Sequence, residues 1–281
     1  MSKLSIIIPT WNTADITIKC IEAINKFLPK DFFELIIVDN SSTDNTVSKI
    51  KKLIHSLKIE NCKLKINSSN LGFSKANNIG AKIAVGDYLL FLNSDMELID
   101  PSLIKMIDYL KLNPKVGLIG PQFLNPNLTI QGSVLPPQTP LNALKEYWLG
   151  SKGSYTKYYL NNTSSVNSIS GGAILIKKEI FDQISGWDER YFFYYEDLEL
   201  CRQVKKIGKE IIYFPESKVI HRHGASGTAI VDTPNQWRRL VPSSILYHGK
   251  LTHYLIISII WTSQKWQEIF GKKQQKETLL Q

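Results

Sequence analysis

Short apolar runs and amphipathic stretches alternate along the first part of the chain. Residues 4–8 are nearly all apolar and Pro9 ends the run, as expected for a strand that is buried on both faces. Apolar side chains then recur at every third or fourth position over 18–28, which predicts a helix that begins after Thr13. The same alternation predicts strands at 35–38, 63–66, 88–92 and 116–119, and helices at 47–57, 74–84 and 101–112, the last with Asp100 as its cap.

This order of elements predicts an α/β fold, with a Rossmann-like, mostly parallel central sheet and helices on both faces. Ligands of such sheets bind beyond the carboxyl ends of the strands, and the polar sequences PTWN, VDNSSTDNT and NSD follow three of the predicted strands. From 121 to 166 the chain is rich in Pro, Asn, Gly and Ser, which predicts loops and short elements that face a substrate. A further strand is predicted at 210–215. We therefore expect the binding chemistry at one edge of the sheet.

The composition limits the class of protein. With 281 residues and 43% hydrophobic content, the chain can bury a core of its own. Its formal net charge of +9 suits phosphates, anionic lipid or nucleic acid without choosing among them. Cys20, Cys62 and Cys201 are odd in number and form no C-x-x-C pair, so neither a disulfide framework nor a zinc cluster is expected. Because no secretory leader is visible either, we expect a cytoplasmic location.

Two acidic residues follow predicted strands directly. Asp95, in FLNSDMEL, stands two positions after Asn93, and a carboxylate there can bind Mg2+ or Mn2+, which prefer oxygen ligands and accept substrate phosphates as the others. The alternative is an aspartate that caps a turn. Asp39, in IIVDNSSTDNT, can accept hydrogen bonds from a ribose or a base, whereas Ser42 or Asp44 explains the rest of that stretch as a helix cap.

The stretch SNLGFSKANNIG combines small and amide residues around a predicted helix start. Gly72 allows close approach of the backbone, and the amides at a helix N-terminus favour anions, so a nucleotide can lie here. The pattern is neither G-x-G-x-x-G nor G-x-x-x-x-G-K-[ST], which argues against a dinucleotide-dependent dehydrogenase and a P-loop NTPase. Taken alone, a turn followed by a helix explains it equally well.

The sequence YFFYYEDLELCRQ places five consecutive aromatic residues, 191–195, directly before the acidic residues Glu196, Asp197 and Glu199. Acidic residues in the first turn of a helix are favoured by the helix dipole, which explains the acids but not the rings. Sugar sites present aromatic faces beside carboxylates, and an acid that loses solvation has a raised pKa, closer to that of a general base. Downstream, His221 and His223 stand two positions apart and share a face if the segment is extended, where one can bind a metal or a diphosphate.

Together these stretches resemble an inverting family 2 glycosyltransferase with the GT-A fold, and within it the bacterial rhamnosyltransferases. The motifs SIIIPTWN, VDNSSTDNT, NLGFSKANNIG, LNSDMEL, the segment from SGGAILIK to YYEDLELCRQVKKIG, and HRHGAS occur in the expected order over residues 4–226. The resemblance implies that the nucleotide-sugar donor is held by Thr10, Asn12, Asp39, Ser41, Asn70, Gly72, Phe73, Asn77, Asn93 and Ser94.

The resemblance also implies the remaining roles. Asp95 is the metal-binding acid of the family's D-x-D element, whose first acid is replaced here by Asn93, and His221 or His223 completes the Mg2+ or Mn2+ site. Asp197 is the base that deprotonates the acceptor hydroxyl, with Glu196 as the alternative. The residues implied on the sugar and acceptor side are Gly171, Gly172, Trp187 and Asp188.

The implied reaction moves a sugar, L-rhamnose from dTDP-rhamnose or another sugar from a UDP or GDP donor, to a bacterial surface glycan or a lipid-linked acceptor. The implied catalytic domain covers 1–226, with a nucleotide-binding half at 1–120 and an acceptor half at 121–226, and a helical extension covers 227–281. No nucleic acid partner is expected.

The C-terminal segment 253–276 has an apolar run shorter than the ~20 residues of a membrane span. Its Trp261, Trp266, Phe270 and following lysines suit a helix that lies at the surface of an anionic membrane, on its inner face. A helix packed on the catalytic domain, or at the contact of a homodimer, explains them equally well.

Two rival functions differ in class or reaction. A sugar nucleotidylyltransferase needs a Gly-rich loop with Arg or Lys after the first strand, and PTWNTAD lacks it. A non-catalytic glycan-binding protein predicts that metal and nucleotide do not bind together.

Overall fold

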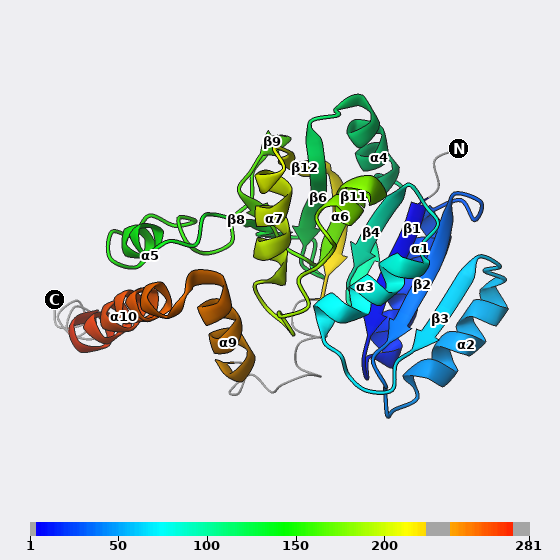
Figure 1. Ribbon diagram of the computed structural model, residues 1–281, viewed down its shortest axis with the longest axis horizontal. Helices are drawn as coiled ribbons and strands as arrows, with labels where there is room; N and C mark the ends of the chain where they lie inside the picture. Colours follow the sequence, from blue (N-terminus) through cyan, green and yellow to red (C-terminus); the bar gives the residue numbers. More distant parts are fainter. Residues whose placement is uncertain (1–3, 223–236, 272–281) are drawn as a thin grey trace.

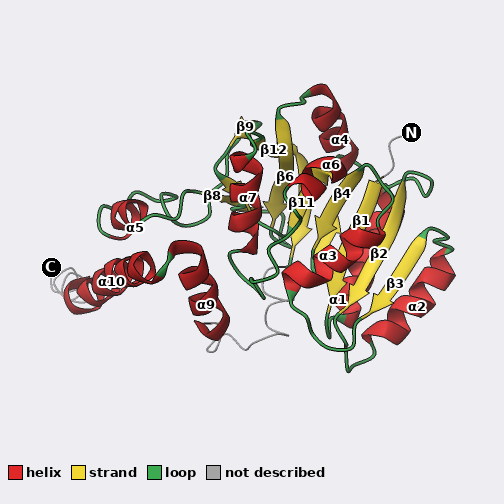
Figure 2. Cartoon of the chain, in the orientation of Figure 1, coloured by secondary structure: helices red, strands yellow, loops and turns green. Residues whose placement is uncertain are grey.

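A single path of eight strands crosses the protein (Figure 2). The computed structural model describes residues 4–222 and 237–271. The strands lie in the order β3-β2-β1-β4-β11-β6-β12-β5. Beside this path, β7 pairs with β6 and β9 pairs with β12, and β8 and β10 form a separate two-stranded sheet. Their bounds are β1 Leu4–Thr10, β2 Phe33–Asp39, β3 Cys62–Ile66, β4 Tyr88–Leu92, β5 Met96–Leu98, β6 Val116–Leu124, β7 Ile130–Gln131, β8 Val134–Leu135, β9 Ser164–Ser165, β10 Ser168–Ile169, β11 Ala173–Lys177 and β12 Glu210–His221.

The sheet is mostly parallel, as predicted. β3, β2, β1 and β4 run parallel to one another, as do β6 and β12, whereas β11 runs antiparallel to both β4 and β6, and β5 antiparallel to β12. The sequence pattern does not predict the antiparallel strand β11. Its position matters for the site, because the first residues of β11 lie beside the carboxyl end of β4, where Ala173 pairs with Leu92.

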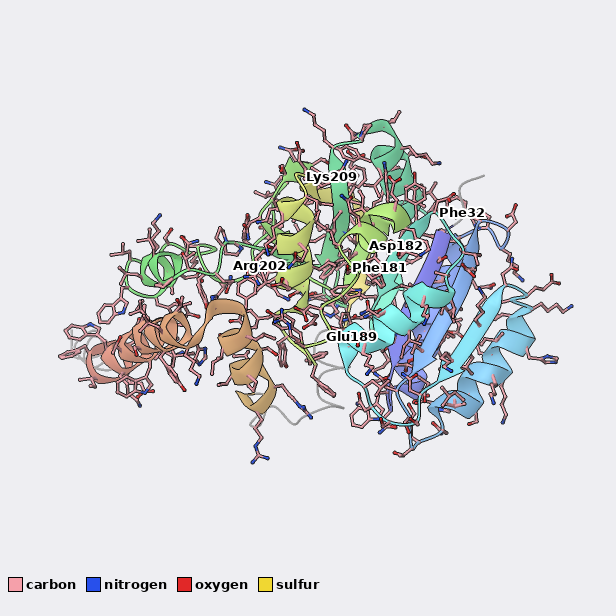
Figure 3. The ribbon with its side chains drawn as sticks, viewed as in Figure 1. Phe32, Phe181, Asp182, Glu189, Arg202 and Lys209 are labelled. Carbon is pink, nitrogen blue, oxygen red and sulfur yellow. The ribbon has the colours of Figure 1, made fainter. Side chains whose placement is uncertain are left out.

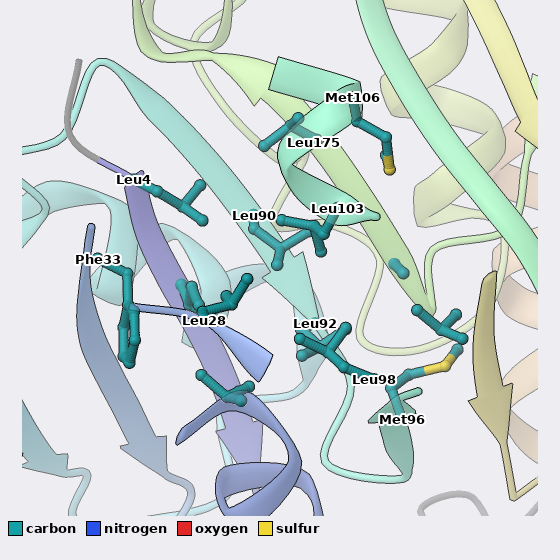
Figure 4. Close-up of a cluster of buried hydrophobic side chains, with 14 of the residues drawn as sticks. Leu4, Leu28, Phe33, Leu90, Leu92, Met96, Leu98, Leu103, Met106 and Leu175 are labelled. Carbon is teal, nitrogen blue, oxygen red and sulfur yellow. The ribbon is translucent and has the colours of Figure 1, made fainter. Parts of the chain in front are cut away.

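Helices cover both faces of the sheet (Figure 1). The bounds are α1 Ala14–Phe27, α2 Thr46–Leu57, α3 Phe73–Ile83, α4 Leu103–Leu112, α5 Pro140–Tyr147, α6 Lys178–Gln183, α7 Glu196–Lys206, α9 Trp237–His248, α10 Lys250–Trp266 and η2 Gln267–Gly271. One buried cluster joins the sheet to α1, α2 and α4, and Figure 4 shows part of it, including Leu90, Leu103 and Met106. The second cluster joins the opposite face to α3, α6 and α7. Burial on both faces explains the continuous apolar runs of the central strands.

Several element boundaries differ from those predicted. Strand β6 continues to Leu124 and β12 to His221, past a break in register between Phe214 and Lys218. Helix α4 begins only at Leu103, because Asp100 accepts a hydrogen bond from the Ser102 amide in a turn (2.8 Å) and Ser102 takes the cap position. Tertiary pairing extends both strands beyond what local periodicity can indicate.

The C-terminal helices lie at one end of the molecule, beside α5 and away from the sheet (Figure 1). The Trp148 indole donates to the Ile259 carbonyl (3.1 Å), and the Ser263 hydroxyl donates to the Tyr147 carbonyl (2.5 Å). Helix α9 packs against α10 and also contacts α7. Within residues 4–222 and 237–271, every helix is too short or too polar to cross a bilayer.

Candidate active site

Hydroxyl groups gather where β1 ends. The Thr10 hydroxyl lies 2.9 Å from those of both Thr13 and Thr17, and the Thr13 hydroxyl lies 3.4 Å from that of Ser94, which follows β4. Thr13 precedes α1 as predicted, but its side chain does not cap the helix and joins this cluster instead. The cluster links the ends of β1 and β4, two of the three strand ends expected to meet.

The end of β2 is fixed by a second network. Both carboxylate oxygens of the buried Asp39 accept from Ser42, from its amide (2.9 Å) and its hydroxyl (2.5 Å). The Ser42 hydroxyl accepts in turn from the Asn12 amide (2.9 Å), and the Asn12 side chain accepts from the Thr43 amide (2.8 Å). Asn12 and Ser41 have positive φ angles of 52° and 64°, a conformation that bulky residues adopt only where the surroundings hold it. Asp39 and Asn12 thus shape this loop. The cap position of α2 is occupied by Asn45, and not by Ser42 or Asp44 as predicted.

The loop before α3 is held by the aromatic stretch. Gly72 has a φ of 83°, and a Cβ added to it would lie 2.6 Å from the Phe192 carbonyl oxygen, which accepts from the Phe73 amide (2.8 Å). The Asn70 side chain accepts from the Gly72 amide (3.0 Å) and shapes the turn. Asn77 is fully buried and donates to the Phe73 carbonyl, so it supports the first turn of α3 from inside.

These segments enclose one cleft at the carboxyl ends of β1, β2 and β4. Its lining consists of Pro9, Thr10, Trp11, Thr13, Asn40, Asn70, Gly72, Phe73, Asn93, Ser94 and Phe193. Six of the ten residues predicted to hold the donor are among them, and Asn12, Asp39, Ser41 and Asn77 are not. Trp11 and Asn40 were missed, although each stands beside a predicted residue in the sequence.

Asp95 and His221 approach each other from different strands. Asp95 is 2% exposed, and its Oδ2 lies 3.8 Å from His221 Nε2 at the end of β12. The other ring nitrogen, Nδ1, lies 2.7 Å from Gln131 Oε1. Because a carbonyl oxygen only accepts, Nδ1 carries a hydrogen, and Nε2 is the ring nitrogen that faces Asp95. Gln131 was not predicted, because β7 is too short to leave a pattern.

This donor set fits a divalent cation that is shared with a substrate. A carboxylate and an imidazole suit Mn2+ or Mg2+, and the orienting hydrogen bond that the His221 ring donates to Gln131 is typical of metal-binding histidines. In the described ranges, no three His, Cys, Asp and Glu side chains group to hold a metal ion, so further ligands would be substrate phosphates and water. The buried Asn93 Oδ1, which has no hydrogen-bond partner among the described residues, offers another oxygen. His223 lies outside the described residues.

The acidic pair begins α7, as predicted. Asp197 Oδ2 accepts from the Gly171 amide (3.0 Å), and Oδ1 accepts from the Leu198 amide (2.8 Å). Glu196 is buried, and burial together with the neighbouring charge of Asp197 raises the pKa of Glu196 to about 8. At neutral pH, therefore, Glu196 mostly keeps its proton.

Two consecutive glycines connect the acidic pair to the segment that contains Asp95. The amide of Gly171 donates to Asp197, and the carbonyl of Gly172 accepts from the Asn93 amide (2.9 Å). A Cβ at Gly172 would lie 2.1 Å from the terminal methyl group of Met96 and 3.2 Å from the Phe123 ring, so these side chains would have to shift. The start of β11 thus holds Asp197 on one side and the segment Asn93–Asp95 on the other, at the same end of β4.

The aromatic stretch proves largely structural. Rings of Phe91, Trp187, Phe73 and Phe193 follow one another at centroid distances of 5.2, 5.3 and 6.3 Å, from the core to the cleft. Tyr191 is 1% exposed and cannot stack on a sugar. Phe193 lines the cleft, and the half-buried Tyr194 and Tyr195 adopt positive φ angles of 71° and 66° directly before the acids. The rings therefore fix the entry into α7, and only their partly exposed members remain candidates for substrate contact.

Trp187 belongs to this aromatic row, and Asp188 follows it in the chain. Trp187 is buried, and its backbone exchanges two hydrogen bonds with the side chain of Asn78 on α3. Asp188 is paired with Arg190, and the hydrogen bond from that guanidinium lowers the pKa of Asp188. Trp187 can shape the cleft only through Phe73, without touching a ligand.

Helix α7 is also tied to α9 through Arg202, which is labelled in Figure 3. Arg202 pairs with the buried Glu199 one turn earlier, donates to the Tyr247 carbonyl (3.4 Å) and lies 4.6 Å from the centre of the Tyr247 ring. Tyr195 stacks against the same ring at 5.4 Å. No local sequence pattern indicates this contact, because its partners are 45 residues apart.

A family model described as glycosyl transferase family 2 matches residues 5–185. The chain belongs to this family. The matched region contains Asp95, the paired glycines and every residue of the cleft lining except Phe193, and it ends before α7. The enzyme is thus a glycosyltransferase, as the motifs indicated.

Individual relatives are distant. The chain is 26% identical to the O-antigen biosynthesis protein RfbC of Myxococcus xanthus over 81% of its own length, but spans only 18% of that protein. It is 26% identical to an N-acetylglucosaminyl-diphospho-decaprenol L-rhamnosyltransferase of Mycobacterium tuberculosis, over 69% of this chain and 67% of the relative. A mannosyltransferase of Pyrobaculum calidifontis, solved with GDP-Man and Mn2+, has a similar fold, with a TM-score of 0.62, 16% identity, and coverage of 95% of this chain and 75% of that one.

Proposed function

We propose that this enzyme transfers a sugar from a nucleotide diphosphate donor to an acceptor hydroxyl in one displacement, with inversion at the anomeric carbon. The observation that carries the proposal is the pair of glycines at the start of β11, which join the Asp197 carboxylate to the segment of Asp95. A donor bound in the cleft would then have its diphosphate at Asp95 and its sugar toward Asp197.

Asp197 is the base in this proposal. It takes the proton of the acceptor hydroxyl while that oxygen bonds to the anomeric carbon and the nucleotide diphosphate leaves with the electron pair. The raised pKa of Glu196, about 8, supports this choice, because a protonated acid cannot accept the proton. The backbone amides of Gly171 and Leu198 hold the Asp197 carboxylate in one orientation.

Asp95 and His221 would hold a divalent cation, with Gln131 fixing the imidazole. The chemistry that such a cation supplies is neutralisation of the charge on the departing diphosphate. Thr10, Asn70 and the other residues of the cleft would bind the nucleoside.

The donor and acceptor are proposed from the relatives. The mycobacterial rhamnosyltransferase supports dTDP-L-rhamnose as the donor and a lipid-linked glycan as the acceptor, and the myxococcal relative supports a role in surface polysaccharide synthesis. A UDP- or GDP-sugar donor is the alternative, since the structural neighbour was solved with GDP-Man.

A donor screen tests the proposal. Release of nucleotide diphosphate is measured with dTDP-rhamnose and with UDP- and GDP-sugars, with and without Mn2+, for the enzyme and for Asp197→Asn. We expect one donor to be turned over, and Asp197→Asn to lower kcat by about 10²- to 10⁴-fold with unchanged nucleotide affinity. The matched control is Asp182→Asn, on the exposed surface of α6 (Figure 3), which should retain full activity.

Two results would contradict the proposal. Full turnover by Asp197→Asn would remove Asp197 as the base. Calorimetric titration that shows no nucleotide binding in the presence of Mn2+ would instead favour the non-catalytic, glycan-binding alternative.

A further inference from the structure

Helix α10 buries only three side chains, two of them polar, and exposes several of its large apolar side chains. The residues of α10 that are buried are His253, Ile256 and Ser263, of which His253 bonds to Ser244 on α9 and Ser263 to the Tyr147 carbonyl. The outer face, by contrast, carries Leu251, which is 85% exposed, and the exposed Leu255. A helix of a water-soluble surface has the opposite arrangement.

The outer apolar residues form a continuous stripe. Exposed positions recur at three- and four-residue spacing along α10, as Leu251, Tyr254, Leu255, Ser258, Trp261 and Thr262. The two hydroxyls within this stripe need no water, because Ser258 donates to the Tyr254 carbonyl (2.8 Å) and Thr262 to the Ser258 carbonyl (2.7 Å). These two hydroxyls can therefore leave water without losing a hydrogen bond.

Further exposed rings extend the stripe at the end of α10. Trp148 after α5 stacks near Trp266 at 6.1 Å, and Trp266 stacks on Phe270 at 4.2 Å, with each of the three about half exposed. Tryptophan and tyrosine are enriched where proteins meet the boundary of lipid and water, since their rings are apolar with one polar edge. Leu144 and Leu149, also exposed, continue this surface onto α5 and the turn that follows it.

The charges around this surface are mainly positive. Exposed basic residues on α5, on α10 and in the turn after α5 are Lys145, Lys152, Lys250 and Lys265. The acids nearby are engaged: Glu268 pairs with Lys265, and Glu146 accepts from the Tyr155 and Thr156 amides. An apolar stripe with basic flanks complements an anionic lipid surface, whereas two copies of it would bring like charges together.

We propose that the outer face of α10, with the adjoining rings of α5 and η2, docks on an anionic phospholipid bilayer. The helix would lie in the plane of the membrane, with Leu251, Leu255 and Trp261 inserted among the acyl chains and the lysines at the headgroups. The proposal does not depend on the identity of the donor or the acceptor.

Vesicle flotation tests the docking. The full chain is mixed with vesicles of phosphatidylcholine alone, or with about a third phosphatidylglycerol, at low and high salt. We expect binding to the anionic vesicles that weakens with salt. The double variant Leu251→Ser with Leu255→Ser should lose roughly tenfold or more of its partition coefficient. The control is Val85→Ser with Leu112→Ser, which removes exposed apolar side chains elsewhere and should bind as the parent does.

Release of nucleotide diphosphate in solution is measured for all variants, which separates a failure of docking from a failure of catalysis. Absence of binding to anionic vesicles, or equal binding by both double variants, would overturn the proposal. A parent chain that sediments as a dimer, with the α10 variant as a monomer and no vesicle binding by either, would identify the face as a contact between two copies instead.

Discussion

The Gly171 amide donates to the Asp197 carboxylate at 3.0 Å, and a Cβ on Gly171 would lie 3.2 Å from the Asp197 Cβ. The glycine thus holds the proposed base while leaving just enough room for it. Because the same turn is bonded to Asn93, the position of Asp197 relative to the metal-binding segment depends on this backbone.

Gly171→Ala should therefore move the base without removing it. The added methyl group would lie closer to the Asp197 Cβ than ordinary van der Waals contacts allow, so either Asp197 or the turn must shift by a few tenths of an ångström. We expect kcat to fall by about 10- to 100-fold, as for a misplaced catalytic group. Steady-state kinetics and nucleotide titration measure this, and an unchanged kcat would show that the contact does not position Asp197.

The pH dependence of stability should report Glu196. Its pKa is raised on folding, from the ordinary value of 4.5 to about 8, so the stabilisation from its bound proton is complete below the ordinary value and is lost as the pH rises through 8. The free energy of unfolding should fall over this window by on the order of a few kcal/mol. In Glu196→Gln this fall should largely disappear, as measured by urea unfolding at several pH values. A curve of equal steepness in the variant would contradict the raised pKa.

Gln131→Leu should weaken metal binding without touching a metal ligand. Loss of the bond to His221 Nδ1 frees the ring to rotate and to adopt the other tautomer. We expect the affinity for Mn2+, measured calorimetrically with nucleotide present, to fall by about 10- to 100-fold. Gln138→Leu, at a similarly placed glutamine bonded only to backbone carbonyls, is the control and should bind Mn2+ normally. Equal affinities for the two variants would exclude His221 as an oriented ligand.

Substitutions at two glycines should distinguish the cost of backbone strain from the cost of a steric clash. Gly72 and Gly208 have φ angles of 83° and 75°, but only a Cβ at Gly72 would meet another atom, the Phe192 oxygen. Gly208→Ala should lower the free energy of unfolding by about 1 kcal/mol through strain alone. Gly72→Ala should cost more and should weaken nucleotide binding, because the loop and the aromatic stretch must separate. Similar losses of stability, with nucleotide binding intact, would contradict this reading of the Phe192 contact.

The sequence predicted what short-range periodicity and strand-end chemistry can encode. Most strands and helices up to residue 119, and the clustering of Thr10, Asn70 and Asn93 at one edge, followed from patterns within about ten residues. The antiparallel β11, the length of β12 and the bond from Gln131 to His221 depend on pairing between distant segments, which leaves no local signal. The aromatic residues 191–195 were read as sugar-facing, but packing against Phe73 and Trp187 takes up much of their surface.

Arg202 gives the acidic helix a mechanical partner at the C-terminal end of the protein. Asp197 and Arg202 belong to the same short helix, less than two turns apart. A shift of Tyr247 on α9 would therefore move Arg202 and, through the helix, the Asp197 carboxylate. If attachment to a bilayer changes the pose of α9, thermodynamic reciprocity requires that donor occupancy change the strength of attachment by the same factor. Where attachment raises donor affinity, the loaded enzyme would reside longer on the bilayer; where attachment lowers it, the loaded enzyme would leave sooner.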